Sequence, residues 1–165
     1  MTAVEQVTRQ ALNTGLDQMR SGWTPAEILC CLTDAALLIE PTAGGQARIN
    51  EDDYVEGAPE LVAEVAASSV AVDLNAKFRA YQRNGVREYL VWRVEDRAID
   101  WFALRGGRFE RVQPDAQGVL RSDVFPGLWL NVTAILRDDM ASVLKTLQLG
   151  LDTPEHAAFK ARLSI

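Results

Sequence analysis

The sequence predicts an α/β (α+β) fold in which helices flank a central sheet. Short continuous apolar runs are typical of buried strands, and other segments repeat apolar residues at three- and four-residue steps, as amphipathic helices do. These segments follow one another in the order helices, strands, helix, strands, helices. The chain has 165 residues, of which 48% are hydrophobic, so we expect one domain over residues 1–165 with its own core.

The first elements are predicted to be two helices and two strands. Apolar residues at helical spacing predict a helix over residues 4–19, and the capping box Thr24-Pro25-Ala26-Glu27 predicts a short helix to about Cys31. The apolar run at residues 35–39 predicts a buried strand, although a run this short does not exclude a helix. Residues 61–66 predict a second buried strand.

The rest of the chain is predicted to alternate between helix and strand. Residues 73–84 predict a helix that Gly85 closes. Further strands are expected at residues 88–94, 98–104 and 108–112, with a hairpin turn at Gly106-Gly107, and a short strand or extended segment is expected at residues 127–132. Two helices, over residues 133–149 and 154–163, are expected to end the chain, the second with Thr153 as its cap.

Charge and composition exclude several classes of protein. Lys and Arg number 17 against 23 Asp and Glu, and the resulting net charge of −6 excludes a generic basic nucleic-acid binder. Any contact with DNA would then come from a local patch, a metal or a second subunit. No apolar run reaches the roughly 18 residues that cross a bilayer. No secretory leader is visible, and the adjacent Cys30 and Cys31 fit a reducing compartment, so we expect a cytoplasmic protein without membrane contact.

Glu64 lies in the middle of the predicted strand at residues 61–66. Its neighbours are apolar on both sides, which is typical of a strand that is covered on both faces. Alternation places Glu64 on the same face as Val62 and Ala66. A carboxylate buried there is costly unless it is paired, protonated or bound to a metal. The alternative is an ordinary glutamate near the strand end that reaches water.

Lys77 lies at the edge of the apolar stripe of the predicted helix at residues 73–84. At about 100° per residue, the stripe consists of Leu74, Phe78 and Tyr81, and Lys77 is about 60° from Leu74. Asp73 is one turn before Lys77 and is placed to pair with it. The alternative is a lysine that lays its stem on the core and keeps its ammonium group in water.

Asp34 immediately precedes the apolar run at residues 35–39 and is the third candidate site residue. The alternative is that Asp34 is an ordinary aspartate in a turn. Together, Asp34, Glu64 and Lys77 suggest a site for phosphodiester hydrolysis. Two carboxylates can hold a hard divalent cation such as Mg²⁺, which polarises a phosphoryl group and lowers the pKa of its bound water. A nearby lysine can orient that water or offset charge that develops on the phosphate.

The same residues resemble the Uma-two family of restriction-endonuclease-like proteins, whose superfamily has a PD-(D/E)XK active site. The resemblance is carried by Pro59-Glu60-Leu61-Val62-Ala63-Glu64-Val65, Ser68-Ser69, Asp73, Lys77, Tyr81, Asn84-Gly85-Val86-Arg87-Glu88-Tyr89 and the Gly-Gly-Gln stretch at residues 44–46. It extends from about Asp34 to the C-terminus and is most specific over residues 59–92. It implies a central mixed sheet flanked by helices.

The resemblance also implies roles for individual residues. Asp34 matches the first metal-binding acid, Glu64 the second acid, and Lys77 a catalytic lysine that has moved from the strand to the next helix. The implied activity is that of an endonuclease that depends on Mg²⁺ or Mn²⁺ and acts on nucleic acid, with DNA as the expected substrate. A homodimer is also expected. Asp73 would contact the site residues rather than the metal itself.

The sequence departs from the family pattern at several positions. Thr33-Asp34 occupies the position where the family has Pro-Asp. Pro59-Glu60 occupies the position of a second Pro-Asp pair, so glutamate replaces aspartate there. The 33 residues before Asp34 are fewer than family members usually carry, which suggests a shortened or divergent N-terminal region where Glu5 is a candidate helical acid. The alternative function is therefore a catalytically inactive nuclease-like module that binds or scaffolds. Arg79, Arg83, Arg87, Arg93 and Arg97 form either a solvated face or a local phosphate-contacting surface.

Overall fold

The computed structural model describes residues 33–51, 55–67 and 72–163, and it describes only the backbone of residues 72–74. The helices expected over residues 4–19 and up to Cys31 therefore lie outside the described residues. Within the described part, a mixed five-stranded sheet forms the centre of the fold, as expected. Its strands, in spatial order, are β1 (Ala35–Leu37), β4 (Leu61–Ala66), β5 (Glu88–Arg93), β6 (Ala98–Arg105) and β7 (Arg108–Arg111).

The pairing within the sheet is parallel at its centre and antiparallel elsewhere. Strands β4 and β5 are parallel, with Glu64 opposite Val91, whereas β1 pairs antiparallel with β4. The crossover between β4 and β5 contains helix α3 (Val72–Asn84), because parallel neighbours need a long connection. Strands β6 and β7 form the predicted hairpin, and Gly106 and Gly107 both have positive φ in its turn.

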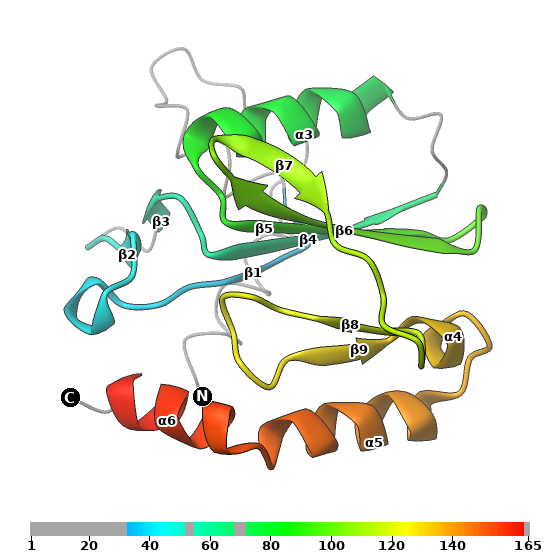
Figure 1. Ribbon diagram of the computed structural model, residues 1–165. Coiled ribbons are helices and arrows are strands. Elements are labelled where there is room, and N and C mark those ends of the chain that lie inside the picture. The colour runs from blue at the N-terminus through cyan, green and yellow to red at the C-terminus, as the bar shows by residue number, and fades with distance from the viewer. Residues whose placement is uncertain (1–32, 52–54, 68–71, 164–165) are drawn as a thin grey trace.

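Different layers cover the two faces of this sheet (Figure 1). Helix α3 lies on one face, and the small hairpin of β8 (Val119–Arg121) and β9 (Trp129–Asn131) lies on the other. Beyond that hairpin lie α5 (Met140–Leu151), which contacts β9, and α6 (Pro154–Leu163). Layers on both faces of the sheet thus explain why most residues of β4 and β5 are apolar.

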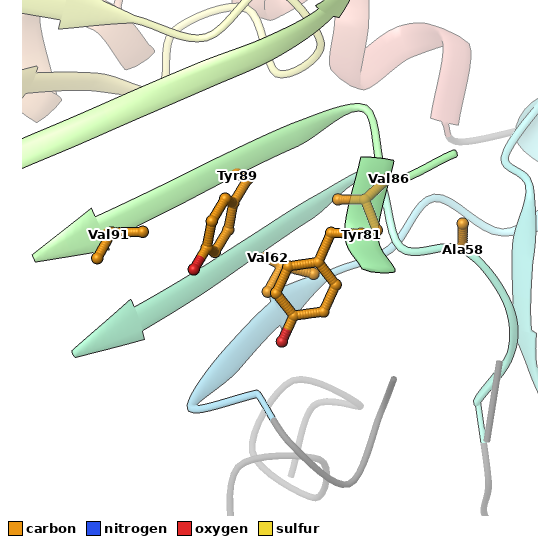
Figure 2. Close-up of a cluster of buried hydrophobic side chains, with 6 residues drawn as sticks. All are labelled: Ala58, Val62, Tyr81, Val86, Tyr89 and Val91. Atoms are coloured by element: carbon orange, nitrogen blue, oxygen red, sulfur yellow. The ribbon is translucent and has the colours of Figure 1, made fainter. Parts of the chain in front are cut away.

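Two apolar clusters correspond to these two interfaces. On the α3 side, Val62 of β4 and Tyr89 and Val91 of β5 pack with Tyr81 of α3. Figure 2 shows Tyr81 and Tyr89 within this cluster, with both hydroxyls at the same end. On the opposite side, Leu61 and Trp101 pack with Leu120 of β8. Full burial of a side chain of this kind contributes about 1.5–3 kcal/mol, so the two clusters hold α3 and the C-terminal layer to the sheet.

Several expected elements differ from the structure. The helix expected over residues 133–149 is wrong as a single helix, because it is divided into α4 (Val132–Ile135) and α5. Asp138 has a φ of 59°, and the side chain of Asp139 accepts a hydrogen bond from the backbone of Ser142 and begins α5. Asp138 thus interrupts the helical path between α4 and α5, and Asp139 starts α5, since aspartate tolerates the left-handed conformation and caps helices well.

Strand β1 is shorter and less buried than expected. It ends at Leu37, and Ala35 is exposed, because β1 lies at the edge of the sheet. The sequence analysis also missed β8 and an antiparallel hairpin made of β2 (Ala47–Ile49) and β3 (Val55–Gly57). A short 3-10 helix, η1 (Pro41–Ala43), precedes that hairpin. Strands this short present too few residues for alternation to be recognised.

Glu60 fastens the segment between β1 and β2 to the start of β4. Its side chain is fully buried, and its two oxygens accept hydrogen bonds from the backbone amides of Ile39 (2.8 Å) and Gln46 (2.9 Å). The chain approaches itself closely here, because a Cβ on Gly45 would lie 1.5 Å from the Ile39 carbonyl oxygen. Glycine is therefore required at residue 45, and Glu60 supplies hydrogen-bond acceptors to two backbone amides of this segment.

Glu88 has a comparable structural role at the start of β5, on the other face. The carboxylate is fully buried and accepts hydrogen bonds from the Ser122 hydroxyl (2.7 Å) and from the backbone amides of Asp123 (2.7 Å) and Val124 (3.2 Å). Burial raises the pKa of the Glu88 carboxyl, and these hydrogen bonds offset part of the effect. Glu88 thus joins the sheet to the turn that follows β8.

We expect Glu88→Gln to change the pH dependence of stability. A carboxyl with a raised folded-state pKa binds its proton more tightly in the folded chain, so its contribution to stability falls as pH rises from about 4.5 through the raised value. The free energy of unfolding of E88Q should therefore increase relative to that of the unsubstituted chain over that interval. Urea unfolding of both chains between about pH 4.5 and pH 7 measures the difference. A difference that does not change with pH would contradict this assignment.

Candidate active site

Glu64 is buried on the face of the sheet that α3 covers. It lies in β4 between Val62 and Ala66, which contact the α3-side cluster, and the residue is 4% exposed. The structure therefore confirms the predicted face and excludes the alternative of a strand-end glutamate that reaches water. A carboxylate at this depth needs partners that compensate for its lost hydration.

Two side chains of α3 supply these partners, one for each carboxylate oxygen. Lys77 Nζ lies 2.8 Å from Oε2 of Glu64, and the Tyr81 hydroxyl donates a hydrogen bond of 2.5 Å to Oε1. Lys77 and Tyr81 are four residues apart, so they share one face of the helix. The Lys77 side chain is mostly covered, at 16% exposed, and its ammonium group contacts the carboxylate directly.

Asp34 lies next to this group, immediately before β1. Ala35 pairs with Ala63 in the antiparallel register, so the next position along places Asp34 beside Glu64. Oδ2 of Asp34 accepts a hydrogen bond of 2.6 Å from the backbone amide of Val65. Asp34 itself is exposed, so the pair consists of one buried and one solvent-accessible acid at the same edge of the site.

The charges of the site act on one another. Burial raises the pKa of the Glu64 carboxyl, and the nearby Asp34 charge adds to the increase, whereas the hydrogen bonds from Lys77 and Tyr81 partly oppose it. Burial and the adjacent Glu64 carboxylate also raise the pKa of the Tyr81 hydroxyl, which therefore remains a hydrogen-bond donor. The site thus contains negative charge that is costly to keep and that an added cation would stabilise.

The residues present fit a hard divalent cation with few protein ligands. Asp34 and Glu64 supply carboxylate oxygens, and Mg²⁺ commonly binds through one or two carboxylates while it keeps several waters. Among the described residues, no group of three or more His, Cys, Asp or Glu side chains is placed to hold a metal ion. Of the metals proteins use, this donor set suits Mg²⁺ or Mn²⁺ and not the nitrogen and sulfur coordination of structural zinc.

The structure thus brings Asp34, Glu64 and Lys77 together from three separate elements. The side chain of Asp73, which was expected to pair with Lys77, and the whole of Glu5 lie outside the described part of the chain. The sequence analysis did not assign a role to Tyr81. Its four-residue spacing from Lys77 is the signal that points to it, since two polar groups at that spacing reach the same place.

The arginines expected to form one basic surface are not gathered at one place. Arg87 precedes β5 and contacts the Gln46 side chain, whereas Arg93 ends β5 and pairs with Asp96 and Asp100. Arg97 contacts the carbonyl group of Leu136 in the C-terminal layer. Arg79 and Arg83 remain exposed on α3. A shared phosphate-contacting surface of all five arginines is therefore wrong, because they point to different layers of the fold.

The helices within the described residues are each too short or too polar to cross a bilayer.

Comparison with known proteins identifies the family. The family model Uma2 (Uma-two), described as "Putative restriction endonuclease", matches residues 10–133. The match begins before the expected start near Asp34 and ends before α5, so the C-terminal helices are not part of it. A search of the curated proteins found no match. Because the matched region covers more than half of the 165 residues, the chain belongs to the Uma2 family of restriction-endonuclease-like proteins.

Proposed function

We propose that this protein is a metal-dependent endonuclease that hydrolyses phosphodiester bonds of nucleic acid, with DNA as the first substrate to test. Family membership supports a nuclease-like function and nucleic-acid binding. The observation that carries the proposal is the convergence of Asp34, Glu64 and Lys77, which come from the start of β1, from β4 and from α3. Two acids and one cationic group in one place match what this hydrolysis needs.

In this proposal the two acids would hold Mg²⁺ or Mn²⁺ between β1 and β4. The bound cation would polarise the phosphate and lower the pKa of a coordinated water. Glu64 contributes a carboxylate whose position is held by Lys77 and Tyr81. Asp34 contributes a carboxylate that the Val65 amide orients.

Hydrolysis adds a water molecule across one phosphorus–oxygen bond of the nucleic-acid backbone. The water oxygen bonds to phosphorus and gives up a proton to solvent, the bond to one ester oxygen breaks, and that oxygen takes a proton from solvent and leaves as a hydroxyl. The ammonium group of Lys77 would donate a hydrogen bond to a phosphate oxygen as negative charge develops there. The exposed Arg79 and Arg83 on the same helix are candidates for contacts with flanking phosphates. The homodimer and the cytoplasmic location remain predictions.

Cleavage of supercoiled plasmid and of single-stranded RNA, each with and without Mg²⁺ or Mn²⁺, tests the proposal. We expect Asp34→Asn and Lys77→Met each to slow cleavage by at least about 100-fold, because each removes a charge that stabilises the transition state or its cation. Lys145→Met is the matched control, since Lys145 is an exposed lysine on α5. Cleavage that persists in both site variants would contradict the assignment.

A catalytically inactive nuclease-like module is the second candidate, and one observation favours it. Lys77 already neutralises Glu64 by direct contact, so the buried charge is compensated without a metal. Calorimetry with Mn²⁺ distinguishes the two functions. An inactive module would release no heat with Mn²⁺ and would bind DNA equally well with and without a chelator.

A further inference from the structure

The two oxygens of Glu64 are held by partners of different character. Oε1 accepts its hydrogen bond from Tyr81, whereas Oε2 lies against the Lys77 ammonium group. One partner is neutral and the other carries a full positive charge. The difference matters for any cation that approaches the carboxylate, because a neutral donor does not repel it and an ammonium group does.

Tyr81 is held rigidly. The residue is 1% exposed, and its ring packs against that of Tyr89 with the ring centres 5.0 Å apart. Val62 and Val86 complete the surroundings, as Figure 2 shows. A ring enclosed in this way cannot turn its hydroxyl elsewhere without disturbing the cluster, because buried side chains are close-packed.

Lys77 is less enclosed than Tyr81. Its side chain is 16% exposed, whereas Tyr81 is 1% exposed, so Lys77 borders solvent. A lysine has a long flexible stem and can move its charged end while the stem remains on the apolar surface. Moving the Lys77 ammonium group off Oε2 therefore costs less than moving the Tyr81 hydroxyl off Oε1.

We propose that Tyr81 is a positioning residue that fixes Oε1 of Glu64, so that a divalent cation reaches Glu64 through Oε2 and displaces Lys77 from it. The inference rests on the metal site of the proposed function. An ammonium group and a divalent cation that share one oxygen repel each other strongly, because the two positive charges then lie close together. Displacement of Lys77 directs its charge away from Glu64, where it is available to a phosphate oxygen. One helix thereby supplies both a fixed and an exchangeable contact to the same carboxylate.

The proposal predicts changes of opposite sign in metal affinity, measured by calorimetric titration with Mn²⁺. Tyr81→Phe keeps the ring but removes the donor, and we expect binding about 10-fold weaker, in the range for groups that orient metal ligands. Lys77→Met removes the competing charge, and we expect binding about 10-fold tighter. Tyr89→Phe and Lys145→Met are the matched controls, and circular dichroism checks that each variant is folded.

Each outcome decides the proposal. Unchanged affinity in Y81F overturns the positioning role, and unchanged or weaker affinity in K77M overturns the exchange. Binding of Mn²⁺ by K77M but not by the unsubstituted chain supports the exchange and shows that the proposed function fails in the natural sequence. Absence of binding in both overturns both proposals. The expected affinities without any cleavage of nucleic acid would leave this inference standing and overturn the nuclease function alone.

Discussion

Replacement of Glu60 by glutamine is expected to lower the free energy of unfolding by about 3 kcal/mol, the largest stability change predicted here. Each oxygen of the fully buried carboxylate accepts a hydrogen bond from a different backbone amide, that of Ile39 or Gln46. Glutamine keeps one acceptor and turns an NH₂ group toward the other amide. Loss of a charge-assisted hydrogen bond costs about 1.5–3 kcal/mol, and a buried donor without a partner adds about 1–3 kcal/mol.

Urea unfolding measures this effect, and Glu40→Gln is the matched control. Glu40 lies in the same segment but is exposed, so its substitution should change stability by less than about 0.5 kcal/mol. The segment from Ile39 to Gln46 is also expected to become sensitive to protease in E60Q, because Glu60 fastens it to β4. A loss below about 1 kcal/mol in E60Q would show that these hydrogen bonds are not needed to hold the segment.

Replacement of Glu64 by glutamine is expected to have the opposite effect: a large loss of cleavage with little change in stability. We expect cleavage to fall by at least about 1000-fold, because a neutral amide is a poor ligand for a divalent cation and both proposed metal ligands are needed. Stability should change by less than about 1 kcal/mol. Burial already raises the pKa of Glu64, so its negative charge is costly in the folded chain and its removal relieves that cost.

The comparison between the two substitutions is the informative measurement. Both change a buried glutamate to glutamine in β4 or immediately before it, and both leave side-chain volume almost unchanged. Glu60 accepts hydrogen bonds from backbone amides, whereas Glu64 is bonded to the side chains of Lys77 and Tyr81. Glutamine can still accept a hydrogen bond from Tyr81, and Lys77 can turn to water. If E64Q is destabilised as much as E60Q, Glu64 has a structural role and the proposed site is wrong.

Local pattern was sufficient to find two residues of the candidate site. Glu64 was recognised because a carboxylate stands inside an apolar strand, and Lys77 because it borders the apolar stripe of a helix. The structure confirms both placements. Asp34 carried little information by itself, and it gained a role only together with Glu64 and Lys77 and from the resemblance to a family. Whether these residues bind metal and cleave a phosphodiester remains a prediction.

Other features could not be read from local pattern. Glu60 and Glu88 were not recognised as structural anchors, because their partners lie 14 to 36 residues away along the chain. The break between α4 and α5 was missed because Asp138 and Asp139 are polar residues that a helix also tolerates at its surface. The five arginines looked like one surface because they are close in sequence, yet they project to different layers.

By itself, the sequence determined which segments are strands and helices at the centre of the fold, and which face of β4 carries Glu64. These properties depend on alternation and helical spacing, which act over a few residues. Tertiary structure alone decided which oxygen of Glu64 meets Lys77 and which meets Tyr81, and which buried glutamates hold distant backbone amides. Such contacts depend on how separate elements pack, and packing is set by the whole core rather than by neighbours along the chain.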